Sequence, residues 1–499
     1  MNTPTGFDFR PPQYAKVVAR GRRMRVLRNV GALLGVVLLL TGAWIGAGRW
    51  LNGCSSGMWR GVDDECVGVS DGSASLHPGL GDIEEKIERE NDRIAGIGGK
   101  VVTVAVLTPV PEPGGERASV SLEQVRSKII GAYLAQRKTN LVEGAYPLIR
   151  LVIADEGSNE KSWQPVVEKL IGLTEDEQPL VAVTGLGVSI GETIDAAHLL
   201  ARHDIPMVGA VLTADGLNMT GAVRSERGPI RGLYRVSPSN HTEVLALHEH
   251  LATQQRKYML VRDQNFNDFY TTGLRDDFAE VFSAELESSG VQRSFDGTPG
   301  INGTTNQFNE IGNELCSPGT PDTVLYAGRA SLLDAFVEKL RDRYCQKQIT
   351  VVTGSDAAKL ANTELPQNVD VIYAALADPK ALGDKRFNVY AEDYRANFDA
   401  YRQREGIDSR DLGNGWAIME FDAMTAVVLA AQNALRGETE IGPAEVRTSL
   451  VGLTSERSAV TGAGDKFYFN ADTGDPVGRT IHVIHRFGNE SEPVDKYTS

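Results

Sequence analysis

From residue 100 onward, short apolar runs alternate with amphipathic segments, and this alternation restricts the fold more than any other feature of the chain. The runs KVVTVAVLTPV, PLIRLVIADE and PLVAVTG are rich in β-branched residues, and a segment with helical periodicity follows each of them. Continuous apolar strands between helices are typical of βαβ units, in which helices cover both faces of a parallel sheet. The pattern therefore predicts a first α/β domain over residues 100–237.

The same alternation begins again after the turn-like VSPSNHTE. The runs KYMLVRD, DTVLYAG and ITVVTGS predict a second doubly wound parallel sheet. Two helical stretches follow, and the closing KFYFNADTGDPVGRTIHVIHRF is typical of a hairpin around its Asp-Thr-Gly-Asp turn. The predicted segments are 100–237 and 377–438 for the first lobe, 238–376 for the second lobe, and 439–499 for the hairpin that closes both.

Residues 30–48 carry no charge and are long enough to cross a bilayer as a helix. Seven Lys or Arg against one Asp precede them in residues 1–28, which places the N-terminus in the cytoplasm and the chain after about residue 50 outside. Arg49 and Trp50 follow the span instead of a small-residue cleavage site. We therefore expect an uncleaved single-pass anchor over 29–49 in the cell membrane, with a cleaved signal peptide as the alternative.

The four cysteines, Cys54, Cys66, Cys316 and Cys345, suit an oxidising compartment. Their even number favours two disulfides, and we expect Cys54–Cys66 and Cys316–Cys345, although the count alone leaves the connectivity open. No C-x-x-C spacing is present, so no zinc site is expected. LNGC at 51–54 resembles a lipoprotein cleavage box, but a lipid on Cys54 would leave Cys66 unpaired.

Residues 50–99 are predicted to form an extracytoplasmic stalk. Their first part is rich in Gly, Ser and Asp, and LGDIEEKIERENDRIAGI over 80–97 then repeats apolar residues at alternating three- and four-residue steps. This short heptad stripe has two interpretations. It is a linker helix lying against the domain, or a stalk that dimerises weakly.

The charge of the chain argues against a nucleic-acid partner. The formal net charge is −15 at neutral pH, and the basic residues 1–28 carry +6, which leaves −21 for the remainder. Phosphate contacts require a basic face, and a polyanion of this size does not provide one.

TGLGVSIGETIDAAHLL, which begins at Thr184, has three interpretations. Its G-x-S-x-G matches a hydrolase nucleophile elbow, its glycines approximate a dinucleotide-binding loop, and Ser189 could bind an anion at a helix N-terminus. The glycine spacing and the position after the third strand disfavour a dinucleotide. No residue pattern singles out His482 or His485 as a catalytic partner, so a hydrolase is the weaker alternative and we expect no enzyme.

The order of these elements resembles the type I periplasmic binding proteins, specifically the branched-chain amino-acid receptors of ABC importers. The stretches that carry the resemblance are IPMVGAVLTAD, YRVSPSNHTEVLALHEHL, MLVRDQNFNDFYTTGL, AIMEFDAMTAVVLAAQNA and VTGAGDKFYFNADTGD, in the family's order over about residues 100–490. The resemblance implies two α/β lobes joined by three crossings, with a ligand held between them.

The resemblance also implies the ligand-binding residues. Ser189 and Thr213, with backbone groups of Val211 and Leu212, match positions that hold the α-carboxylate and ammonium of an amino acid. Asp356 matches the acid that pairs with the ammonium, and a buried ammonium needs such a partner. The remaining candidates are Tyr270, an aromatic wall in uncertain register, and Arg329, which stands near a usual aromatic and would add a bidentate site for a second anionic group.

Two other groups of polar residues have ordinary interpretations. His241, His248 and His250 do not have the i, i+4 spacing of zinc ligands on a helix. Asp472 and Asp475 lie in the closing turn without the later acidic ligand of a calcium loop. We therefore expect no metal and no cofactor.

The sequence thus predicts a membrane-tethered extracytoplasmic receptor that closes on a small amino-acid-like ligand. One spanning helix cannot form a pore, so delivery would be to an ABC permease encoded elsewhere. The alternative is a ligand sensor or cell-surface interaction protein with the same fold and no role in transport.

Overall fold

The computed structural model describes residues 53–113, 118–144, 146–217, 229–298, 303–436 and 440–498. Residues Gly57–Ser499 form one compact unit. The predicted membrane helix over 30–48 and the basic segment before it lie outside the described residues. Within those ranges, no helix combines the length and the apolarity that crossing a bilayer requires.

The first sheet has the strand order β1-β2-β4-β3-β5-β6-β7. The five strands from β4 to β7 are parallel, and β1 and β2 extend one edge in antiparallel fashion. The parallel strands are almost wholly buried, as expected for a sheet covered on both faces. The bounds are β1 (Met58–Arg60), β2 (Cys66–Ser70), β3 (Val101–Thr108), β4 (Leu148–Asp155), β5 (Leu180–Gly185), β6 (Met207–Gly209) and β7 (Leu233–Arg235).

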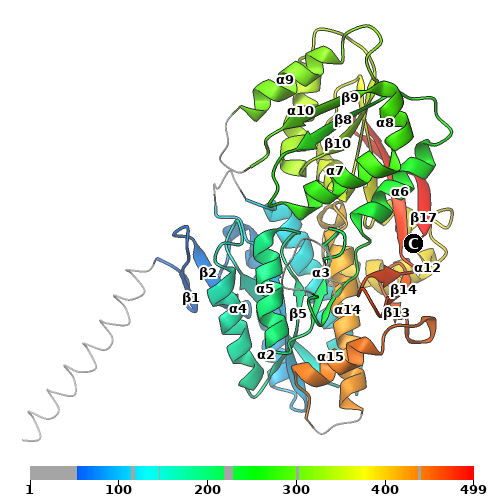
Figure 1. Ribbon diagram of the computed structural model, residues 1–499. Helices are drawn as coiled ribbons and strands as arrows, with labels where there is room; N and C mark the ends of the chain where they lie inside the picture. Colours follow the sequence, from blue (N-terminus) through cyan, green and yellow to red (C-terminus); the bar gives the residue numbers. More distant parts are fainter. Residues whose placement is uncertain are drawn as a thin grey trace, which may run out of the picture. The chain divides into compact units, whose positions relative to one another are not determined.

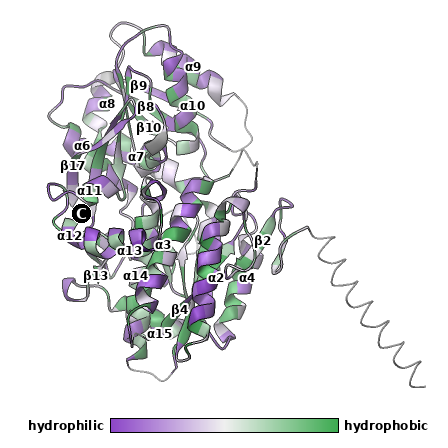
Figure 2. Ribbon diagram, turned by 180° about the vertical axis from the view of Figure 1, so that it is seen from behind, coloured by the Kyte–Doolittle hydropathy of each residue, from purple (hydrophilic) through white to green (hydrophobic). Residues whose placement is uncertain are grey.

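Helices pack on both faces of this sheet and complete the first lobe. One face is covered by α2 (Gly81–Ala95), α3 (Leu122–Asn140), α14 (Trp416–Leu435) and α15 (Pro443–Val451). The other face is covered by α4 (Trp163–Gly172) and α5 (Gly191–Arg202). In Figure 1 the orange α14 lies beside the cyan α3, although the two helices are far apart in the sequence. Figure 2 shows α2 as largely hydrophilic on its outer surface and α14 as largely hydrophobic.

The second lobe is built around the sheet β17-β16-β12-β11-β10-β8-β9. Helices α6 (Asn240–Leu251), α7 (Phe269–Val281) and α8 (Ser283–Ser289) cover one face, and α9 (Thr304–Glu314) and α10 (Ala330–Arg341) cover the other. The strands from β9 to β12 are parallel, with β16 and β17 added antiparallel. Their bounds are β8 (Tyr258–Asp263), β9 (Val291–Phe295), β10 (Thr323–Ala327), β11 (Ile349–Thr353), β12 (Val369–Ala375), β16 (Thr480–Phe487) and β17 (Glu490–Thr498).

The chain passes between the lobes three times: from β7 to α6, from β12 back to α14, and from β15 to β16. The predicted hairpin around the Asp-Thr-Gly-Asp turn is present as β14 and β15, but the longer strand β16 does not belong to it. Strand β14 pairs with the short β15, and β16 crosses to the second sheet and pairs with β12 and β17. The residues of β16 are buried, and an open strand edge in the second lobe offers them full backbone pairing. The remaining elements are α11 (Pro379–Leu382), α12 (Ala391–Asp393), α13 (Ala400–Arg404), β13 (Val460–Thr461), β14 (Lys466–Phe469) and β15 (Pro476–Val477).

The segment predicted as a stalk belongs largely to the first lobe. Val67 on β2 is buried against α4, with Trp59 and Val69 packed around it. On α2, Ile83, Ile87 and Ile94 are buried, the first two in the first-lobe core. The apolar stripe of this helix therefore packs on its own domain, as in the first of the two interpretations.

The predicted Cys316–Cys345 disulfide is confirmed, and it joins the end of α9 to the segment after α10. Cys54 and Cys66 are also disulfide-bonded, and the structure leaves no described cysteine free.

We predict that Gly131→Ala destabilises the protein through the contact between α3 and α14. A Cβ at Gly131 would overlap the backbone carbonyl of Ala417, which cannot rotate away. Overpacking of this kind costs about 1–3 kcal/mol. Urea unfolding measures the effect. In the matched control Gly312→Ala, on α9, the new Cβ makes only ordinary contacts, so the free energy of unfolding should stay equal or rise.

Candidate ligand-binding site

The two lobes meet where the carboxyl ends of their parallel strands face one another. The backbone N–H of Phe269 donates to the carbonyl of Ser189 over 2.9 Å, beside a bridge between Ile190 and Asp268. Gln124 on α3 also donates to Asp356 over 3.4 Å. Ligands of open α/β sheets sit beyond the carboxyl ends of strands, so this junction is the candidate site.

Ser189 lies on a tight turn between β5 and α5. Gly185, Leu186 and Gly187 adopt left-handed conformations in succession, with φ of 82°, 61° and 43°. Leu186 is not a glycine, so its conformation is unusual and is maintained by the surrounding packing. Ser189 is buried, and its hydroxyl oxygen accepts a 3.3 Å bond from the N–H of Ala214.

The predicted residues after β6 are buried beside this turn. Leu212 uses its carbonyl to accept bonds from the Arg235 guanidinium over 3.0 Å and from the Ser237 hydroxyl over 2.6 Å. The carbonyl of Thr213 accepts a 2.7 Å bond from the N–H of Asn240, where α6 begins. Val211 is 8% exposed. The bond between Ser189 and Ala214 therefore brings this segment and the Ser189 turn together.

On the second lobe, Tyr270, Arg329 and Asp356 form one cluster. Arg329 donates both Nε and Nη2 to Asp268, over 2.6 and 2.9 Å, and its guanidinium lies 4.6 Å from the centre of the Tyr270 ring. Asp356 accepts a 2.9 Å bond from the N–H of Ala330 at the start of α10, and it lies 4.0 Å from Arg329. The cluster thus combines one guanidinium with two carboxylates.

Asp268 changes the interpretation of Arg329. Burial alone would lower the pKa of Arg329, but the charges of Asp268 and Asp356 outweigh it and raise the pKa above its ordinary value. The bidentate face that could have received a ligand anion is occupied by Asp268. The sequence analysis missed this residue, although its place as the capping residue of α7 was a usable signal.

A second group of charged residues lies beneath the Ser189 turn and was not predicted. Lys128, Glu156, Glu160 and Glu420 come from α3, the loop after β4 and α14, and each is at most 1% exposed. Burial raises the pKa of Glu160 to about 7 and that of Glu420 to about 8, although the charge of Lys128 acts in the opposite direction. Both carboxyl oxygens of Glu156 and of Glu420 are buried without a hydrogen-bond partner.

Comparison with solved structures identifies the fold. An ABC transporter substrate-binding protein from Desulfitobacterium hafniense in complex with Leu matches with a TM-score of 0.57 and 17% identity, covering 79% of this chain and 100% of that one. The branched-chain amino-acid binding protein LivJ from Streptococcus pneumoniae, in complex with isoleucine, matches with a TM-score of 0.59 and 16% identity, over 80% and 100% of the two chains.

A solute binding protein from Rhodopseudomonas palustris BisB5, in complex with 3,4-dihydroxy benzoic acid, matches with a TM-score of 0.56 and 13% identity, over 80% of this chain and 97% of that one. The chain has the type I periplasmic binding-protein fold. Comparison with protein-family models and with curated proteins found no match. At these identities the likeness establishes the fold, and the resemblance inferred from the order of sequence elements is confirmed at that level.

Within this type I fold, the geometry around Ser189 does not support a nucleophile elbow. Its hydroxyl contacts a backbone N–H, and His482 and His485 lie on β16 of the second sheet, where His485 contacts Asp370 over 3.3 Å. His241, His248 and His250 contact three different acids. Among the described residues, no group of His, Cys, Asp or Glu is arranged to hold a metal ion.

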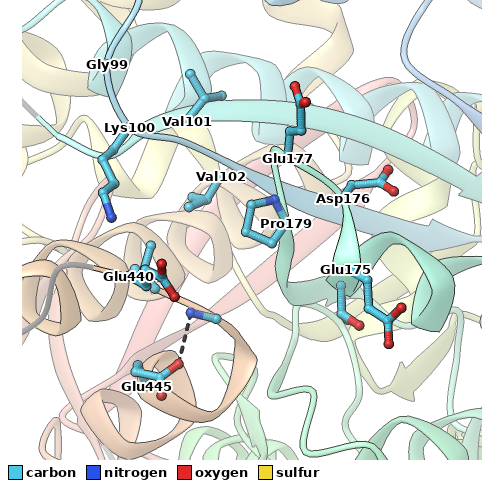
Figure 3. A pocket seen from close by; sticks show the side chains of 13 residues that line it. Gly99, Lys100, Val101, Val102, Glu175, Asp176, Glu177, Pro179, Glu440 and Glu445 are labelled. Atoms are coloured by element: carbon cyan, nitrogen blue, oxygen red, sulfur yellow. Dashed lines mark hydrogen bonds between the residues drawn. The ribbon is translucent and has the colours of Figure 1, made fainter.

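A separate pocket of about 960 Å³ lies at the opposite edge of the first sheet (Figure 3). It opens beside the amino ends of β3 and β5, at Lys100 and Pro179, and carries the carboxylates of Glu175, Glu177 and Glu440. Ligands of open α/β sheets lie beyond the carboxyl ends of the strands, so this pocket at the amino ends is not the candidate site.

We predict that Glu420→Gln stabilises the protein progressively as the pH rises from 5 to 8. In the unfolded chain Glu420 loses its proton near its ordinary pKa of 4.5, whereas in the folded chain burial keeps the proton until about pH 8. The wild type therefore loses stability over this window and the Gln variant does not. Urea unfolding at several pH values measures the difference. The control variant is Glu310→Gln, which removes an exposed carboxyl on α9. Its difference from the wild type in the free energy of unfolding should stay constant with pH.

Proposed function

We propose that this protein is a membrane-anchored extracytoplasmic solute-binding receptor that closes on a small amino-acid-like molecule and delivers it to an ABC permease. The observation that carries the proposal is the pairing of two complementary half-sites across the lobe junction. The first lobe contributes Ser189 just before α5, and the second contributes Asp356, which follows β11 and accepts a bond from the first residue of α10. Solved proteins of the same fold hold Leu and isoleucine.

The first lobe would hold the carboxylate of the ligand. The first N–H groups of a helix have no partner within the helix and attract anions, and α5 begins two residues after Ser189. The Ser189 oxygen accepts a bond from Ala214, and a hydroxyl that accepts can still donate its own hydrogen to a carboxylate. Thr213, with Val211 and Leu212, lies next to this position and would complete the first half-site.

The second lobe would hold the ammonium. Arg329 neutralises one of its two neighbouring acids, so the cluster of Arg329, Asp268 and Asp356 keeps one uncompensated negative charge. A single ammonium would balance that charge, and Asp356 is the acid that Arg329 engages less closely. Tyr270 and the stacked Arg329 would form the wall of the site. This arrangement favours a zwitterion over a dianionic ligand.

The anchor proposal rests on residues 30–48, which are apolar and follow a basic segment. A receptor held at the membrane surface would remain close to a permease in the same membrane. A ligand sensor or cell-surface interaction protein would use the same anchor, and transport is distinguished from sensing by whether ligand uptake depends on the protein.

We predict that an amino acid stabilises residues 53–499 and that Asp356→Asn removes the effect. A ligand present at one hundred times its Kd adds about 2.7 kcal/mol to the free energy of unfolding, which a melting-temperature panel detects. Asn can still accept the bond from Ala330, so the fold should persist. Loss of a buried charge partner costs about 2 kcal/mol or more, equivalent to about thirtyfold or more in affinity.

The matched control is Asp342→Asn, which removes an exposed acid at the other end of α10. It should bind as the wild type does. A well-folded protein with no response to amino acids or small carboxylates would contradict the receptor proposal and favour the interaction protein.

We predict that the full chain remains with the membrane after washing with salt and alkali, because an apolar helix is held by burial of its surface in lipid. Replacing residues 1–52 with a cleavable signal peptide should release the protein in soluble form. Cell fractionation followed by intact-mass measurement checks both. Cys54→Ser should stay in the membrane, whereas its release would show that a lipid on Cys54 is the anchor.

A further inference from the structure

Glu160 ties the turn that carries Ser189 to the interior of the first lobe. Its side chain is fully buried, and its Oε1 accepts a 3.1 Å bond from the N–H of Val188, the residue before Ser189. Its Oε2 lies 2.5 Å from the hydroxyl of Thr193 in the first turn of α5. A Cβ at Gly187 would overlap the Glu160 carboxyl, so the turn and this carboxyl are in direct contact.

The hydrogen count around Thr193 shows which form of Glu160 fits this arrangement. The Thr193 hydroxyl contacts both the Glu160 carboxyl and the carbonyl of Val188, and it has one hydrogen to donate. With Glu160 ionised, both neighbours are acceptors and one contact has no hydrogen. With Glu160 protonated, its O–H donates to Thr193, and Thr193 donates to Val188. Both contacts of the Thr193 hydroxyl then contain a hydrogen.

The charged groups around Glu160 come from several elements. Lys128 on α3 donates to the carbonyl of Gly187 over 3.4 Å, and its charge favours the ionised form of Glu160, whereas Glu192 on α5 disfavours it. Glu156 lies in the same loop, and Lys128 also faces Glu420 on α14. Asp155 and Glu65 lie beyond Glu156. Lys128 is thus the one basic residue within this group of three buried glutamates, Glu156, Glu160 and Glu420. Carboxyl groups whose charge Lys128 does not balance are neutralised by binding protons.

We propose that Glu160 is a positioning residue that links ligand binding to protonation: the Ser189 turn keeps its binding geometry while Glu160 carries a proton and loosens when the proton is lost. The part that concerns ligand affinity rests on the proposed receptor function. The part that concerns the turn does not.

The size of the effect follows from where Glu160 titrates. Burial raises the pKa of Glu160 to about 7, despite the opposing bonds from Thr193 and Val188. If only the protonated form is competent to bind, the apparent Kd rises about tenfold between pH 6 and pH 8.

The test compares the full-length wild type with Glu160→Gln and Glu160→Ala. An amide side chain reproduces the protonated carboxyl, because its oxygen accepts from Val188 and its NH₂ donates to Thr193. Hydrogen exchange of the peptide that contains Val188 is measured at pH 6 and pH 8 and expressed as a protection factor, which removes the intrinsic effect of pH on exchange. Protection should fall with pH in the wild type, stay high in Glu160→Gln, and be low at both pH values in Glu160→Ala.

Glu156→Gln is the matched control, since it removes a buried carboxyl of the same group that makes no bond to the turn. It should keep the pH dependence of the wild type, because Glu156 makes no hydrogen bond to Val188 or Thr193. The same pH dependence in Glu160→Gln as in the wild type would overturn the proposal, as would wild-type protection in Glu160→Ala.

A binding measurement with L-leucine separates this proposal from the receptor function. Its Kd should rise about tenfold from pH 6 to pH 8 for the wild type and stay constant for Glu160→Gln. Absence of binding at either pH, together with pH-dependent protection of the turn, would support the role of Glu160 and count against leucine as the ligand. Binding with the same pH dependence in both proteins would support a receptor and overturn the role of Glu160.

Discussion

The close approach of α3 and α14 is the contact on which the two-lobed arrangement depends. Gly131 on α3 lies directly against the carbonyl of Ala417 on α14. The helix α14, which follows the return from the second lobe, therefore packs at backbone distance on α3, the helix that follows β3. This contact closes the first-lobe core after the chain has passed through the second lobe. It also brings Glu420 on α14 towards Lys128 on α3, which creates the buried charge group beneath the Ser189 turn.

Two clusters of charged residues, one around Arg329 and one around Lys128, each contain more acidic than basic side chains. Arg329 faces Asp268 and Asp356 in the second lobe, and Lys128 faces three glutamates in the first. A buried carboxylate without a partner is costly, so each cluster favours uptake of a positive charge. The Arg329 cluster, at the lobe junction, would suit the ligand ammonium of the proposed function, and the fully buried Lys128 cluster would suit protons. Ligand recognition and proton binding can therefore act on the same turn from opposite sides.

The arrangement of strands and helices was readable from the sequence, because continuous β-branched runs are stable only in a sheet covered on both faces. Ser189, Thr213, Tyr270, Arg329 and Asp356 were assigned to a ligand site from the resemblance to the binding proteins, and their role in binding stays a prediction. The partners of these residues were not predictable. Asp268 is sixty residues from Arg329, and Glu160 and Lys128 meet beneath Ser189 only after α3 and the loop after β4 have packed. The pairing of β16 depended on an open edge that belongs to another part of the chain.

The sequence by itself determined the alternation of elements and the charge division between the N-terminal segment and the rest, because local periodicity and composition express these directly. Only the tertiary structure decided that residues 58–95 join the first lobe, that Arg329 is held by Asp268, and that a carboxyl group supports the Ser189 turn from below. These outcomes arise from burial, and the cost of burying a charge depends on neighbours that folding brings from distant positions.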